Sequence, residues 1–178
     1  MDKTFCIFGD SVTQAAYVKV GWVDLLRVYL EQKHKNSFVN VFNLGIGGNT
    51  TQDVLERIDS ESKVRKPSSV IFAVGVNDCK NYDINQFKIN IEKLIEKALN
   101  FNNDIVFVGL VLGNYGGSEG FSKDKVVKYN SVINELSKGA KLKFVDLFDK
   151  LESSDFMDGL HPNDQGHIKM FEEIKKYL

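Results

Sequence analysis

Three residues whose side chains can carry out acyl transfer lie near opposite ends of the chain. Ser11 follows an apolar run, in Phe8-Gly9-Asp10-Ser11-Val12, whereas Asp158 and His161 belong to Asp158-Gly159-Leu160-His161-Pro162. A serine hydroxyl is a weak nucleophile at neutral pH, so it needs a base, and the base needs a group that orients it. Because Asp158 and His161 are three positions apart, Asp158 can accept from Nδ1–H and leave Nε2 free to face Ser11. We therefore predict Ser11 as nucleophile, His161 as general base and Asp158 as the orienting carboxylate.

Such a nucleophile also requires hydrogen-bond donors for the negative oxygen that develops on the substrate. Three donors are candidates: the backbone N–H of Ser11, the N–H of Gly48 and the side-chain amide of Asn77. Gly48 lies in a glycine-rich turn, where the missing side chain lets a substrate approach the backbone closely. We predict that Ser11, Gly48 and Asn77 form an oxyanion hole, and that activity falls at acidic pH as the histidine base is protonated.

Several polar residues in these segments also have structural interpretations. A serine after a strand often only caps a helix, and Asn77 and Asp78 are common turn-forming types. We expect Asp10 to cap the turn after the first strand, Asp78 to brace its loop, and His167 to be structural. The glycine-rich segment around Asn114 and Tyr115 is a candidate for substrate binding, and an ordinary surface loop is an equally good interpretation.

Alternating apolar runs and helical stripes indicate how these residues are positioned. Five runs predict buried strands, and apolar residues at helical spacing follow most of them. The expected strands cover residues 4–8, 38–44, 69–74, 104–112 and 142–148. This alternation predicts an α/β fold: a parallel sheet with helices on both faces. With strand order 2-1-3-4-5, Ser11 lies at the switch point of the sheet, between the loops that carry Gly48 and Asn77.

Composition narrows the class of protein further. The 178 residues are 43% hydrophobic and 26% charged, with a net charge of -1, so we expect one domain over residues 1–178 and no nucleic-acid partner. No apolar run is long enough to cross a membrane or to serve as a leader, which favours a cytoplasmic protein. Cys6 and Cys79 are isolated, so neither a metal site nor a disulfide is expected.

Four ordered segments resemble the motifs of the SGNH hydrolases, also called GDSL-type esterases and lipases. They are Gly9-Asp10-Ser11, the Asn43 to Gly48 turn, Gly75-Val76-Asn77-Asp78 and Asp158-Gly159-Leu160-His161-Pro162. The resemblance spans nearly the whole chain, although Val12 replaces the leucine of the GDSL signature. It implies a flavodoxin-like three-layer α/β/α sandwich, hydrolysis of esters or thioesters, and no metal or other cofactor.

The leading hypothesis is a serine hydrolase that cleaves esters or thioesters of small or soluble acyl substrates through an acyl-enzyme on Ser11. A carbohydrate O-acetylesterase that acts on acetylated sugars is one alternative. Another is a non-enzymatic module that holds the phosphate of FMN near residues 11–13, at a helix N-terminus. The FMN alternative leaves Asn77, Asp158 and His161 without a role. The sequence leaves the acyl chain length, the alcohol portion and the oligomeric state open.

Overall fold

A five-stranded parallel sheet forms the centre of the molecule. The structure is a computed structural model that describes residues 2–101, 104–113, 115 and 121–178. The strands are β1 (Lys3–Gly9), β2 (Val39–Gly45), β3 (Ser69–Ala73), β4 (Asp104–Val108) and β5 (Lys143–Val145), in the order β2-β1-β3-β4-β5. The predicted parallel sheet and its strand order are therefore confirmed.

The register of the sheet brings the ends of three strands into one row. Gly9 pairs with Gly45 of β2 on one side and with Ala73 of β3 on the other. The loops that follow β1, β2 and β3 therefore leave the same edge of the sheet at the same level. This edge is the carboxyl end of the strands, where open α/β sheets bind ligands.

Strands β4 and β5 end four and three residues earlier than the sequence predicted, because side chains take over their backbone hydrogen bonds. After β4, the N–H of Leu110 donates to the side-chain oxygen of Asn130 at 2.8 Å rather than to a neighbouring strand. After β5, Asp146 accepts from the N–H of Phe148 at 3.0 Å and turns the chain. The predicted ends at 112 and 148 were wrong for this reason.

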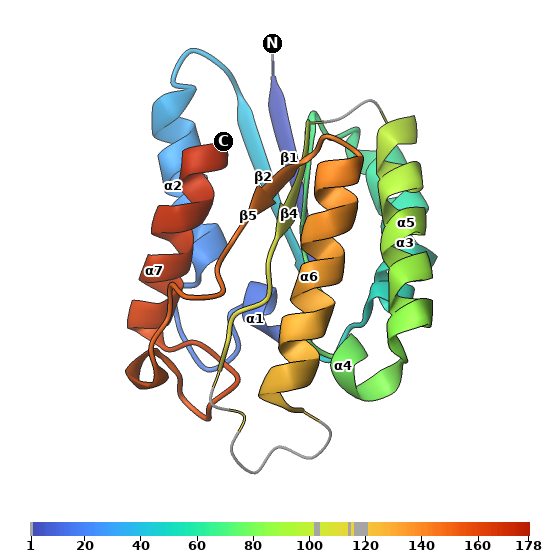
Figure 1. Cartoon of the computed structure of the whole chain (residues 1–178). Coiled ribbons are helices and arrows are strands. Elements are labelled where there is room, and N and C mark those ends of the chain that lie inside the picture. The colour runs from blue at the N-terminus through green and yellow to red at the C-terminus, as the bar shows by residue number, and fades with distance from the viewer. Residues whose placement is uncertain (1, 102–103, 114, 116–120) are drawn as a thin grey trace.

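Helices cover both faces of the sheet and make three layers (Figure 1). On one face lie α2 (Trp22–Lys33) and α7 (Asp164–Ile174), and on the other lie α3 (Thr51–Arg65), α5 (Ile84–Asn100) and α6 (Lys123–Gly139). Each face has its own apolar core, one built around Trp22 and Leu26 and the other around Phe72 and Phe87. Two short helices, α1 (Ser11–Gln14) and α4 (Asp78–Asn81), lie at the carboxyl edge, and 3₁₀ turns occupy Ser153–Asp155 and Lys175–Tyr177.

His167 joins α7 to α2 inside the first of these layers. Its Nδ1 accepts from the N–H of Trp22 at 3.2 Å, and its side chain is buried. Burial lowers the pKa of His167 to about 4, so the imidazole stays neutral and keeps this acceptor. The structural role expected for His167 agrees with this position. Within the described chain, no helix combines the length and apolar character needed to span a membrane.

Candidate active site

Ser11 begins helix α1 immediately after the sharp turn that ends β1. Asp10 caps this helix through a 2.9 Å hydrogen bond from the N–H of Val12, as expected for a structural residue. Gly9 allows the turn, because a Cβ there would lie 2.1 Å from the hydroxyl oxygen of Thr13 and 2.7 Å from the carbonyl oxygen of Ala73. The strand, the glycine and the cap together place the Ser11 side chain at the carboxyl edge of the sheet.

A chain of hydrogen bonds joins Ser11 to the segment before α7. The Oγ of Ser11 lies 2.9 Å from Nε2 of His161, and Nδ1 of His161 lies 2.7 Å from Oδ2 of Asp158. The other oxygen of Asp158 accepts from the backbone N–H of Leu160 at 3.0 Å and of His161 at 2.8 Å. One carboxylate therefore shapes the turn and orients the imidazole. The structure brings together all three residues that the sequence predicted as a catalytic set.

The surroundings of Asp158 keep its carboxylate ionised. Partial burial acts to raise its pKa, but the hydrogen bonds from His161 and Leu160 outweigh burial and hold the pKa below its ordinary value. An ionised carboxylate only accepts hydrogen bonds, so Nδ1 of His161 must carry the proton. Nε2 is then free to accept the hydrogen bond of the Ser11 hydroxyl, as a general base requires.

Two backbone N–H groups near Ser11 are available to a ligand. Within the part of the chain that the structure describes, the N–H groups of Ser11 and Gly48 have no hydrogen-bond acceptor. Gly48 has a φ of +80°, a left-handed conformation that favours glycine, and a Cβ added there would meet open space. Gly48 is thus selected by its backbone angle, and the space before it is free for a substrate.

The third predicted donor, Asn77, is already oriented by one hydrogen bond. Its Nδ2 donates to the carbonyl oxygen of Asn49 at 3.0 Å. A side-chain amide carries two N–H groups, so this bond positions the amide and leaves one N–H for an oxyanion. The amide thereby ties the loop after β3 to the loop that contains Gly48.

Sequence reasoning missed the residues that hold the loop after β2 in place. Arg57 of α3 donates to the carbonyl oxygen of Leu44 at 2.7 Å and to the side chain of Asn49 at 3.1 Å. The side-chain oxygen of Gln14 accepts from the N–H of Gly47 at 2.8 Å. No local pattern identified Arg57 or Gln14, because both contacts depend on how helices α1 and α3 pack against this loop.

Two buried carboxyl groups lie beneath the candidate site. Burial raises the pKa of Asp10 to about 7, opposed by the hydrogen bond from Val12 and reinforced by the nearby charge of Asp78. Burial likewise raises the pKa of Asp78 to about 6, although Thr51 donates to it through both its backbone N–H and its hydroxyl. The bond to Thr51 braces the loop against α3, the role expected for Asp78.

We expect Asp10→Asn to stabilise the protein more at alkaline pH than at acidic pH. The folded-state pKa of Asp10 lies above its ordinary value of 3.8, so the wild-type chain loses stability as pH rises from about 4 to about 7. That rise in pKa corresponds to on the order of 4 kcal/mol, and asparagine keeps the helix cap without the charge. The free energy of unfolding of both proteins, measured at about pH 5 and about pH 8.5, checks this. A difference that does not change with pH would contradict it.

Of the two residues predicted to bind substrate, Asn114 and Tyr115, the structure describes only Tyr115. Asn114 lies outside the described residues. Tyr115 is only 5% exposed; its hydroxyl donates to the carbonyl oxygen of Val111, and its N–H donates to that of Gly159 at 3.1 Å. Tyr115 therefore supports the segment that carries Asp158 and His161 through its backbone bond to Gly159. Contact between Tyr115 and a substrate stays a prediction.

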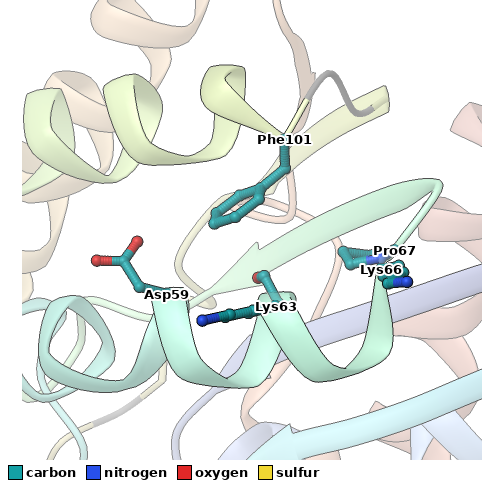
Figure 2. Close-up of a pocket in the computed structure, with 6 residues that line it drawn as sticks. Asp59, Lys63, Lys66, Pro67 and Phe101 are labelled. Atoms are coloured by element: carbon teal, nitrogen blue, oxygen red, sulfur yellow. The ribbon is translucent and has the colours of Figure 1, made fainter.

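A surface pocket of about 590 Å³ lies away from Ser11 (Figure 2). It is lined by Asp59, Ser62, Lys63, Lys66, Pro67 and Phe101. In Figure 2, Phe101 at the end of α5 faces the last turns of α3 across this pocket. The end of α3 leads into the start of β3, so the pocket belongs to the amino-terminal edge of the sheet. The residues predicted to do chemistry lie at the opposite edge.

A hydroxyl, an imidazole and a carboxylate in one hydrogen-bonded chain, beside free N–H donors, form the arrangement that serine hydrolases use. A family model described as the GDSL-like Lipase/Acylhydrolase family matches residues 7–168. The chain belongs to this family, which places it among the carboxylic ester hydrolases. The match contains Ser11, Gly48, Asn77, Asp158 and His161.

Individual relatives agree with the family. Esterase TesA of Pseudomonas aeruginosa is 25% identical over 178 residues, which cover 97% of this chain and 86% of TesA. A multidomain esterase of Ruminococcus flavefaciens is 28% identical over 139 residues, or 70% of this chain, but the chain spans only 18% of that protein. The crystal structure of a lipase/acylhydrolase from Enterococcus faecalis has a similar fold, with a TM-score of 0.85 at 24% identity, covering 98% of this chain and 94% of that one.

Proposed function

We propose that the chain hydrolyses carboxylic esters of small or soluble acyl compounds through an acyl-enzyme on Ser11. The observation that carries this proposal is the continuous contact from Ser11 through His161 to Asp158, at 2.9 Å and 2.7 Å. These distances lie within hydrogen-bond reach, which a nucleophile and its general base require.

In the first half of the reaction, Ser11 Oγ forms a bond to the acyl carbonyl carbon while its proton passes to Nε2 of His161. The π electrons of the carbonyl move onto its oxygen, which the N–H groups of Ser11, Gly48 and Asn77 stabilise. Collapse of this intermediate breaks the bond to the alcohol oxygen, and His161 returns the proton to that oxygen. Asp158 stabilises the imidazolium that exists between the two transfers.

In the second half, water takes the place of the alcohol. It loses a proton to Nε2 of His161 and attacks the acyl carbon, with the oxyanion held by the same donors. The bond to Ser11 Oγ then breaks, the proton passes back to Oγ, and the carboxylic acid leaves. Each donor therefore serves twice in one turnover.

The connections after β1, β2 and β3 are short, which supports small or soluble substrates. α1 starts directly after the turn at Asp10, and only five residues separate the end of β2 from α3, and four separate the end of β3 from α4. None of these connections is long enough to form a separate cover over Ser11. The carboxylate of Asp158, with 46% of its side chain exposed, also lies close to solvent.

The two alternatives have unequal support. Family membership favours hydrolysis over an FMN-binding module, and the Ser11 hydroxyl is already engaged by His161. A carbohydrate O-acetylesterase uses the same chemistry and differs only in the alcohol portion, so it remains an alternative for the substrate. Thioesters differ from esters only in the leaving atom and belong to the same test.

Turnover of p-nitrophenyl esters from acetate to palmitate, with acetylated sugars and an acyl thioester beside them, tests the proposal. We expect the highest kcat/KM on short-chain esters and loss of all turnover after treatment with a fluorophosphonate, which phosphonylates an activated serine. Mass spectrometry should place the added group on the peptide that contains Ser11. Labelling at another serine, or a strong preference for long-chain micellar esters, would contradict the proposal.

A further inference from the structure

Tyr17 is an exposed aromatic residue that lies against the candidate base. Tyr17 is 71% exposed, yet the centroid of its ring is 5.0 Å from that of His161, with an angle of 76° between the ring planes. This is an edge-to-face contact of the kind that aromatic pairs favour. Only 14% of the His161 side chain is exposed, and the aromatic ring beside it is open to solvent.

Tyr17 lies in a turn that follows α1 and is hydrogen-bonded to the backbone of Ser11. Tyr17 has a φ of 71° and Ala15 a φ of 67°, both in the left-handed region that non-glycine residues rarely adopt. The N–H of Ala16 donates to the carbonyl oxygen of Ser11 at 3.0 Å, so this turn closes on the nucleophile itself. Uncommon backbone conformations persist where the surrounding structure holds them, and they cluster at functional sites.

The proposed mechanism determines which part of the ester meets Tyr17. The alcohol oxygen receives its proton from Nε2 of His161, so it must come within hydrogen-bond reach of that atom. The carbonyl oxygen points toward the N–H donors of Gly48 and Asn77, on the loops after β2 and β3. The alcohol substituent is therefore the part of the substrate that lies beside the imidazole and its aromatic neighbour.

We propose that Tyr17 is a specificity-determining residue whose ring contacts the alcohol portion of the ester and favours aromatic or bulky apolar alcohols. This inference rests on the proposed function and adds the leaving-group class to it. The exposed ring supplies apolar contact area, and its partner His161 is the group that protonates this same leaving oxygen. In this arrangement the acyl portion does not contact Tyr17, so we expect the preference for acyl chain length to be independent of it.

Two series of esters separate these portions of the substrate. One holds the acyl group as acetate and varies the alcohol among ethyl, benzyl and 2-naphthyl; the other holds ethanol and extends the acyl group from acetate to hexanoate. Tyr17→Ala should lower kcat/KM about three- to tenfold for benzyl and naphthyl acetates, mainly through KM, and less than about twofold for every ethyl ester. Tyr17→Phe should keep the wild-type pattern.

Tyr177→Ala is the matched control, because Tyr177 is a partly exposed tyrosine in the last 3₁₀ turn. It should leave both series unchanged. An equal loss on all esters with Tyr17→Ala, or a loss that follows the acyl series, would overturn the inference for Tyr17. Hydrolysis that persists at the wild-type rate in Ser11→Ala would instead overturn the proposed function, so the two failures are distinguishable.

Discussion

Ser11→Ala is expected to lower kcat for ester hydrolysis by about three orders of magnitude or more, with little change in stability. Alanine removes the oxygen that forms the acyl bond, and neither His161 nor Asp158 can replace it as the nucleophile in this geometry. The N–H donors of Ser11 and Gly48 remain, so a slow residual reaction with water can persist. Initial rates on p-nitrophenyl acetate, compared with thermal unfolding of the same preparation, measure both effects.

Ser131→Ala is a suitable control for this experiment. Ser131 lies on the exposed side of α6, and its hydroxyl donates to the carbonyl oxygen of Val127 at 3.0 Å within that helix. Its replacement should leave the rate unchanged. If Ser11→Ala folds normally and hydrolyses the ester at the wild-type rate, Ser11 is not the nucleophile.

Asp158→Asn is expected to lower kcat by about 10⁴ while the turn around it stays intact. The amide oxygen of asparagine can still accept from the N–H groups of Leu160 and His161, the two bonds that shape the turn. Its NH₂ group then faces Nδ1 of His161 and donates where the carboxylate accepted. The imidazole must accept at Nδ1 and carry its proton on Nε2, so it can no longer take the proton of Ser11.

Two further variants distinguish the effect of Asp158 on the orientation of His161 from its effect on the stability of the turn. Asp158→Ala removes the turn bonds as well, so it should lower both kcat and the thermal stability. Asp149→Asn changes an exposed carboxylate elsewhere and should alter neither. A kcat of Asp158→Asn within about tenfold of wild type would show that Asp158 does not set the tautomer of His161.

The sequence predicted the sheet, its order and the residues that meet at its carboxyl edge. Apolar runs covered on both faces are strong signals for strands, and parallel strands deliver all following loops to one edge, whereas the strand order agreed with the flavodoxin-like fold that the resemblance implied. Ser11 and His161 are 150 positions apart, yet the loops that follow β1 and β5 leave the same edge of the sheet, which made their contact predictable. The short spacing between Asp158 and His161 predicted their contact, since one turn joins them.

The sequence could not predict contacts that depend on the packing of whole elements. Asn130 reaches the backbone after β4 from α6, and this side chain ends the strand before the apolar run does. Arg57 braces the Gly48 loop from α3, through the carbonyl oxygen of Leu44. No sequence pattern marks Tyr17, because only its left-handed backbone and the position of His161 reveal the contact between their rings.

The hydrogen bond between Ser11 and His161 joins segments far apart in the chain, so we expect hydrolysis to require that both segments are folded. The segment of His161 is joined to the rest of the molecule by the bond from the N–H of Tyr115 to the carbonyl oxygen of Gly159, by the bond between His167 and Trp22, and by apolar contacts of α7 with α2. Local opening of this segment would separate Ser11 from His161, the proposed nucleophile and base, while the sheet stays formed. On mild heating, hydrolysis should therefore disappear before the sheet unfolds, and a partly synthesised chain would carry an ordered but inert serine.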